Sequence, residues 1–205
     1  MTTTLARRFH APGADPHFAS DNIAGAHPEI LAAITAVNDD AAAYGADATT
    51  EAFAEMIDDI FGTGAYGFPV FNGTGANIVS LQAVSHPHSS VVCADTAHVY
   101  TSESSAPVRA GLTLKPQPHH RGKLLPADVV RVLASDVGNP QATQPRAVSI
   151  SQVTEMGTVY APEELTELCN VAHEAGLAVH MDGARLSQAA AALGLDLHGA
   201  TTALG

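Results

Sequence analysis

Residues 178–185 read Ala-Val-His-Met-Asp-Gly-Ala-Arg, and this stretch decides the fold. The short apolar run over residues 177–181 predicts a buried strand, and Asp182 follows it directly. Arg185 opens an Ala-rich stretch that predicts a helix. Ligands of open α/β sheets bind at the carboxyl ends of the strands, which makes Asp182 a candidate site residue. A buried carboxylate needs a partner. Asp182 therefore either pairs internally with Arg185, or faces a protonated ring nitrogen of a ligand while Arg185 faces an anionic substrate group.

Strands and helices alternate outward from this stretch. The helix over residues 53–61 is the clearest element, because its apolar side chains recur with the spacing of one buried face and Gly62 follows as a cap. Further helices are expected over residues 28–37, 74–85, 126–133, 162–175 and 186–193, and further strands over residues 67–72, 91–94, 112–114 and 147–151. This alternation predicts an α/β domain with a mainly parallel sheet.

The composition fits a folded chain and argues against several partners. Of its 205 residues 46 % are hydrophobic and 15 % charged, which allows a substantial core, and the net charge of -12 disfavours nucleic acid and anionic membranes. No apolar run approaches the roughly 20 residues of a membrane span, and no secretory signal opens the chain. Cys93 and Cys169 form neither a disulfide framework nor a metal motif, so we expect a cytoplasmic protein. Residues 1–19 are polar and predict an N-terminal tail.

Two more segments carry candidate ligand-binding groups. Residues 72–77, Asn-Gly-Thr-Gly-Ala-Asn, lie where an expected strand leads into a helix. They suit either a phosphate at the helix N-terminus or a plain capped turn. His98 follows the strand over residues 91–94, and a lone His of this kind is usually structural. Three such segments at neighbouring strand ends favour the functional interpretation, because those ends converge in space.

Three other kinds of site find weaker support in the sequence. Residues 62–67 spell G-x-G-x-x-G, but a helix precedes them and a strand is expected after them, the reverse of a dinucleotide site. His86 with His88, and His119 with His120, lack carboxylate or thiol ligands at a zinc spacing, so a His-rich metal protein is a weak alternative and we expect no metal. A serine hydrolase is disfavoured because no G-x-S-x-G occurs.

Taken in order, six segments resemble the L-threonine aldolases of low specificity within the β-eliminating lyases. The segments are residues 18–22, 44–47, 72–77, 97–103, 154–160 and 180–185. These enzymes depend on pyridoxal 5'-phosphate and have the aspartate-aminotransferase fold. The resemblance implies that residues 20–205 form an N-terminal arm and most of the cofactor-binding large domain, without the small C-terminal domain.

The resemblance also implies the roles of individual residues. Gly73, Thr74 and Gly75 would hold the cofactor phosphate, His98 would stack on the pyridine ring, and Asp182 would keep the ring nitrogen protonated. Ser20 and Arg185 would bind the substrate carboxylate, with Arg185 also near the cofactor. Glu103 would support the His98 side of the site, and Tyr44 would reach the site of a neighbouring subunit in a homodimer or homotetramer.

Two departures from the family pattern matter. Glu155 stands where many members carry His, so the departure leaves the identity of the base open. Glu155 is a candidate catalytic residue together with His98 and Asp182, and the substrate is L-threonine or a bulkier β-hydroxy-α-amino acid such as phenylserine. The only lysines are Lys115 and Lys123, whereas the family's Schiff-base lysine follows the aspartate segment. We therefore expect little aldolase activity from this chain alone. The alternatives are a catalytically inactive subunit that acts as an oligomerisation partner, and a phenylserine aldolase or another pyridoxal-phosphate-dependent lyase of the same fold.

Overall fold

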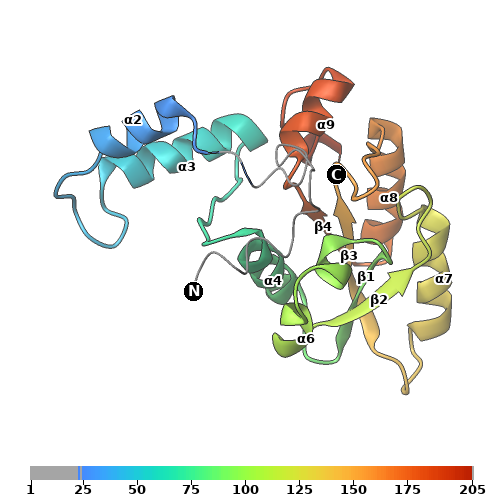
Figure 1. Cartoon of the computed structure of the whole chain (residues 1–205). Coiled ribbons are helices and arrows are strands. Elements are labelled where there is room, and N and C mark those ends of the chain that lie inside the picture. Colours follow the sequence, from blue (N-terminus) through green and yellow to red (C-terminus); the bar gives the residue numbers. More distant parts are fainter. Residues whose placement is uncertain (1–22, 24, 205) are drawn as a thin grey trace, which may run out of the picture. The chain divides into compact units, whose positions relative to one another are not determined.

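The computed structural model describes residue 23 and residues 25–204 (Figure 1). By its contacts the chain divides into two units, residues 1–52 and residues 53–205, and each is described here by itself. The expected N-terminal tail and Ser20 lie outside the described residues.

The second unit is built on a parallel sheet, as the alternation of elements predicts. Its strands are β1 (Ser89–Ala94), β2 (Thr113–Gln117), β3 (Gln144–Ser151) and β4 (Ala178–Asp182). The spatial order is β2-β1-β3-β4, and every neighbouring pair is parallel. All residues of β1 are buried, because a central parallel strand is covered on both faces.

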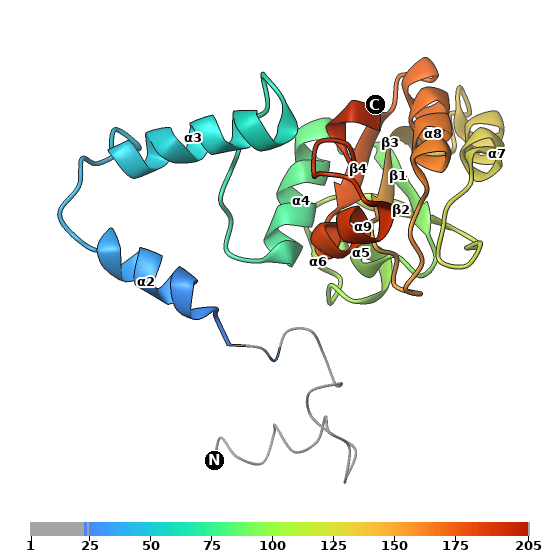
Figure 2. The same ribbon diagram turned by 90° about the horizontal axis from the view of Figure 1, so that it is seen from above.

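Helices cover both faces of this sheet, as Figures 1 and 2 show from two directions. One face carries α7 (Pro126–Asp136) and α8 (Pro162–Glu174), and Val92 packs against this layer. The other face carries α4 (Gly73–Val84), and here Leu81 packs against Val91. Since successive strand residues point to opposite faces of the sheet, Val91 and Val92 pack in different layers of the core.

Shorter helices complete the second unit. They are α5 (His98–Thr101), α6 (Ala106–Arg109), α9 (Leu186–Leu193) and the 3-10 helix η3 (Thr202–Leu204). The sequence predicts α9 but neither α5 nor α6, which are each a single turn. No helix within residues 25–204 combines the length and the apolar character that crossing a membrane requires.

The amphipathic helices α2 (Pro28–Ala36) and α3 (Ala48–Phe61) form where the sequence predicts them, with Pro28 opening the first. Gly62 has a φ of +97° and ends α3, which confirms the predicted cap. The predicted apolar face of α3 is only partly buried: Phe53, Ile57, Ile60 and Phe61 are half-buried, and Met56 is 53 % exposed. Helical spacing identifies the apolar side of a helix, but it does not supply a neighbour that covers it.

The strand expected over residues 67–72 is also wrong, because these residues adopt no regular structure. Pro69 has no backbone N–H to donate to a neighbouring strand. The aromatic side chains of Tyr66, Phe68 and Phe71 are 83 %, 80 % and 99 % exposed, so nothing in the described chain holds them in a sheet. Helix α4 therefore follows an extended loop rather than a strand.

Candidate active site

The candidate site lies at the carboxyl end of the sheet, on the face covered by α4. Ser149 of β3 pairs with His180 of β4, and Ser151 pairs with Asp182. Residues two apart on a strand share a face, and Ala147 of the same series packs in the α4 core. His180 accordingly forms a hydrogen bond between its Nδ1 and Ser149 Oγ at 2.9 Å. Burial lowers the pKa of His180, although the Asp182 and Glu103 carboxylates oppose that shift.

Asn77 joins two carboxylates at this end of the sheet. It is buried on α4, and its Nδ2 donates to Glu103 Oε1 at 2.7 Å and to Asp182 Oδ2 at 3.0 Å. The other oxygen of Asp182, Oδ1, accepts from the backbone N–H of Ala184 at 3.1 Å. Both oxygens of Asp182 therefore have a donor, which fixes the orientation of the carboxylate. The sequence places Asn77 in the segment over residues 72–77 but does not predict this role for it.

His98 lies beside the same cluster. Its ring Nδ1 is 3.0 Å from Glu103 Oε1, and because an ionised carboxylate only accepts, the ring donates. The side chain of Glu103 is fully buried, whereas that of His98 is 46 % exposed. Glu103 thus fixes one edge of the imidazole while nearly half of the ring remains accessible to a ligand.

Glu155 anchors the start of α5. Its Oε1 accepts from the backbone N–H of His98 at 2.7 Å and from Ser151 Oγ at 2.6 Å. Its Oε2 accepts no hydrogen bond from the described residues. The structure therefore brings Glu155 to His98, as the prediction of a shared site requires, and leaves one carboxylate oxygen available.

The topology of the sheet explains why these residues meet. From β1 the chain moves outward to β2 and then returns to β3 on the other side of β1. Such a reversal leaves a crevice beyond the carboxyl ends of the two central strands, where open α/β sheets bind their ligands. His98 follows β1 and Glu155 follows β3, so their contact lies at this reversal.

The loop after β3 is held rigidly. Gln152 is fully buried, and its side chain donates to the carbonyl of Tyr160 at 3.1 Å and accepts from its N–H at 3.0 Å. Within the loop, Thr154 Oγ1 and Thr158 Oγ1 are 2.8 Å apart. Glu155 is thereby carried on a closed loop, although loops are usually the mobile part of a site.

The N-terminus of α4 offers donors for an anion. Asn72 caps the helix, and its Oδ1 accepts from the N–H of Gly75 at 2.8 Å. The N–H groups of Gly73 and Thr74 and the Thr74 hydroxyl form no hydrogen bond with described residues, and the space beside Gly73 is open. Of the three predicted phosphate-binding residues, Gly73 and Thr74 keep free donors, while Gly75 is occupied by the cap.

Arg185 and Tyr44 are the other predicted site residues within the described part of the chain. Arg185 is the N-cap of α9, three residues beyond Asp182. Tyr44 belongs to the first unit, where it is fully exposed with a φ of +60°. Ser20 lies outside the described residues.

The cluster also contains a set of metal-ligating atoms. His98, Glu103 and Asp182 each present one such atom, and these lie within 4.8 Å of one another. Hydrogen bonds from His98 and Asn77 already occupy this set. Among the His residues proposed for a metal, His86 and His88 stack with ring centroids 6.0 Å apart, and His119 pairs with Asp95 at 2.8 Å.

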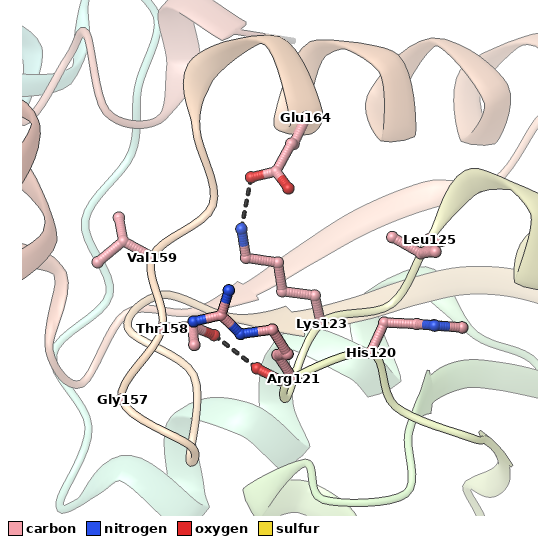
Figure 3. Close-up of a pocket in the computed structure, with 8 residues that line it drawn as sticks. All are labelled: His120, Arg121, Lys123, Leu125, Gly157, Thr158, Val159 and Glu164. Atoms are coloured by element: carbon pink, nitrogen blue, oxygen red, sulfur yellow. Dashed lines mark hydrogen bonds and ion pairs between the residues drawn. The ribbon is translucent and has the colours of Figure 1, made fainter.

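A pocket of about 550 Å³ is lined in part by the loop after β3, and none of the predicted site residues lines it (Figure 3). Its lining comprises His120, Arg121, Lys123, Leu125, Gly157, Thr158, Val159 and Glu164. Lys123 points across it to Glu164 at 2.5 Å, as Figure 3 shows. Lys115 pairs with Asp136 of α7. Both lysines are therefore engaged with the helices of the opposite face of the sheet.

Comparison with known proteins identifies the family. The model of the β-eliminating lyase family matches residues 17–203. The chain belongs to this family. It is 41 % identical to the low specificity L-threonine aldolase of Pseudomonas sp. (strain NCIMB 10558) over 182 residues, which cover 86 % of this chain. It is 31 % identical to that of Saccharomyces cerevisiae over 76 % of this chain.

Solved structures agree with this assignment. The threonine aldolase of Leishmania major superposes with a TM-score of 0.81 at 29 % identity, covering 86 % of this chain and 53 % of that one. The chain spans about half the length of the relatives it matches, 52 % of the Pseudomonas enzyme and 41 % of the yeast enzyme. The parallel sheet flanked by helices is therefore the fold of this part of the β-eliminating lyases, a family of pyridoxal-phosphate-dependent enzymes.

Proposed function

We propose that this chain forms the cofactor-binding part of an aldehyde-lyase that cleaves L-threonine or a related β-hydroxy-α-amino acid into glycine and an aldehyde. The observation that carries the proposal is the hydrogen bond from Asn77 to Asp182. Asn77 lies four residues after Gly73 on α4, a rise of about 6 Å along a helix. This bond therefore links the helix whose N-terminus offers free donors to a fixed carboxylate about one helical turn further along it.

The residues present fit pyridoxal phosphate. Its phosphate would take the free N–H groups of Gly73 and Thr74 and the Thr74 hydroxyl, where the helix dipole favours an anion. Asp182 would accept from a protonated ring nitrogen, and the accessible part of His98 would stack on the ring. When bound, the cofactor supplies an electron-accepting ring for the breaking Cα–Cβ bond.

The substrate would be handled by residues around this cofactor site. Arg185 and Ser20 would bind its carboxylate, and Tyr44 would serve the site of a neighbouring subunit. Glu155 Oε2 would take the proton of the β-hydroxyl while Oε1 stays bound to the backbone of His98. After the Cα–Cβ bond breaks, Cα gains a proton, so L-threonine yields acetaldehyde and glycine, and phenylserine yields benzaldehyde and glycine.

The positions of the two lysines indicate that turnover needs an amine that neither of them supplies. Both Lys115 and Lys123 are engaged in ion pairs on the α7 and α8 face, whereas the candidate site lies on the α4 face. Neither is placed to form a Schiff base with a cofactor held by Asp182. We therefore expect the 205-residue chain to bind pyridoxal phosphate but to release little aldehyde by itself.

Equilibrium dialysis of the purified chain against pyridoxal phosphate tests the site. We expect Asp182→Asn and Thr74→Ala to weaken binding by tenfold or more, and Ser80→Ala, an exposed change on the same helix, to leave it unchanged. Absence of binding by the parent chain, or equal binding by Asp182→Asn, would refute the cofactor site. Aldehyde release from L-threonine and L-phenylserine is measured in parallel, and rapid turnover would refute the argument from the lysines.

A second candidate function is that of a non-catalytic oligomerisation partner. It is favoured by apolar side chains exposed in each unit, such as Ile34 of α2 at 58 % and Phe71 before α4 at 99 %. These surfaces suit a homodimer or homotetramer, or a mixed oligomer with a complete aldolase. Light scattering of the purified chain tests for a homodimer or homotetramer, and co-purification with a complete aldolase of the family tests for a mixed oligomer. A chain that stays monomeric in both experiments would refute this candidate.

A further inference from the structure

In the candidate site two carboxylates accept hydrogen bonds from one side-chain amide, and this arrangement favours a positively charged ligand. Asn77 Nδ2 donates to both Glu103 and Asp182, at 2.7 and 3.0 Å. The amide orientation is unambiguous, because a flipped amide would place its oxygen against two carboxylate oxygens. A side-chain amide nitrogen carries two protons, so one is available for each carboxylate.

The charge of Glu103 is only partly compensated. Its side chain is fully buried, its Oε1 accepts from Asn77 and His98, and its Oε2 has no partner among the described residues. In a region of low dielectric constant a charge acts over several ångströms. A cation that binds against Asp182 is therefore attracted by Glu103 as well.

We propose that Asn77 and Glu103 are positioning residues that make the Asp182 site selective for a protonated ring nitrogen. Asn77 holds the two carboxylates together despite their like charge, and Glu103 adds a second negative charge within 4.8 Å of the Asp182 carboxylate. This inference rests on the proposed function for the identity of the ring, and it adds Asn77 and the charge of Glu103 to the residues that determine binding.

The test compares pyridoxal phosphate with its 1-deaza analogue, in which a CH group replaces the ring nitrogen. In Glu103→Gln the new amide oxygen still accepts from Asn77 and His98, so the shape is kept and the charge is lost. We expect this variant to bind pyridoxal phosphate about tenfold more weakly and the analogue equally well. Asp95→Asn, which removes another carboxylate paired with a His at the same edge of the sheet, is the matched control and should affect neither ligand.

Equal weakening for both ligands would show a merely structural role and overturn the proposal, as would no weakening at all. Absence of pyridoxal phosphate binding by the parent chain would instead refute the cofactor assignment. Whether Asn77 donates to both carboxylates is then tested by NMR of the ligand-free chain. Both side-chain amide protons of Asn77 should exchange slowly, and Asn77 protons that exchange as fast as those of exposed Asn170 would overturn the inference.

Discussion

Replacing Gln152 with Leu tests how the loop that carries Glu155 is held. Gln152 is fully buried, and its carboxamide bonds to both the N–H and the carbonyl of Tyr160. Leucine has a similar volume and no polar atoms. The substitution therefore keeps the packing and leaves two backbone groups of Tyr160 buried without partners.

The expected cost follows from those two groups. A buried donor or acceptor that loses its partner costs about 1–3 kcal/mol, so Gln152→Leu should lower the free energy of unfolding by about 2–6 kcal/mol. A gain from the added apolar surface offsets part of this, at about 25 cal/mol for each Å² removed from water. The polar loss prevails, because leucine replaces only the amide end of a side chain that is already buried.

Urea denaturation followed by far-ultraviolet circular dichroism measures the change. Gln188→Leu, an exposed substitution on α9 whose side chain accepts a hydrogen bond from Ser187, is the matched control and should stay within about 0.5 kcal/mol of the parent. A loss below about 1 kcal/mol for Gln152→Leu would refute the reasoning, because it would mean that the loop repairs both bonds or does not need them.

Three other substitutions test the packing and the electrostatics. Gly122→Ala should lower the free energy of unfolding by about 1–3 kcal/mol more than Gly138→Ala: both residues have positive φ, but a Cβ at Gly122 would lie 2.6 Å from Thr154 Oγ1 while Gly138 faces open space. Leu168→Ala in the core under α8 should cost about 2–5 kcal/mol by urea denaturation, and a cost below 1 kcal/mol would contradict its full burial. Burial lowers the pKa of His180, so below about pH 6.5 the unfolded chain binds a proton that the folded chain resists, and stability falls. In His180→Gln the free energy of unfolding should fall less between about pH 7.5 and about pH 5.5, and an unchanged slope would refute this account.

The sheet and its covering helices follow from local patterns. The run over residues 178–182 and the buried run of β1 are apolar enough to identify strands, and proline opens α2, α7 and α8 at the first helical position. These signals act over a few residues and need no knowledge of the partner. The loop over residues 67–72 shows their limit, since it has the composition of a strand but contains a proline and pairs with no strand in the described part of the chain.

The candidate site likewise contains residues that could be predicted from local sequence and one that could not. Asp182 and His98 could be predicted because Asp182 ends a strand and His98 follows one, and such positions are recognisable in sequence. Asn77 could not, because an asparagine within a helix usually points to solvent, and only the packing of α4 on the sheet turns it inward. Its one local signal is the spacing of four residues to Leu81, since these two are the buried residues of α4.

The strand order then decides which predicted residues meet. A sequence with these strands is equally compatible with orders that place β4 at the far edge from α4, and Asp182 would then have no contact with Asn77. In the observed order β3 lies between β1 and β4, so the carboxyl ends of these three parallel strands are neighbours, and α4 packs against β3 and β4. The bond from Asn77 to Asp182 crosses 105 residues of sequence. Such a contact is specified by topology rather than by any motif, which is why the chemistry of the site depends on the fold as a whole.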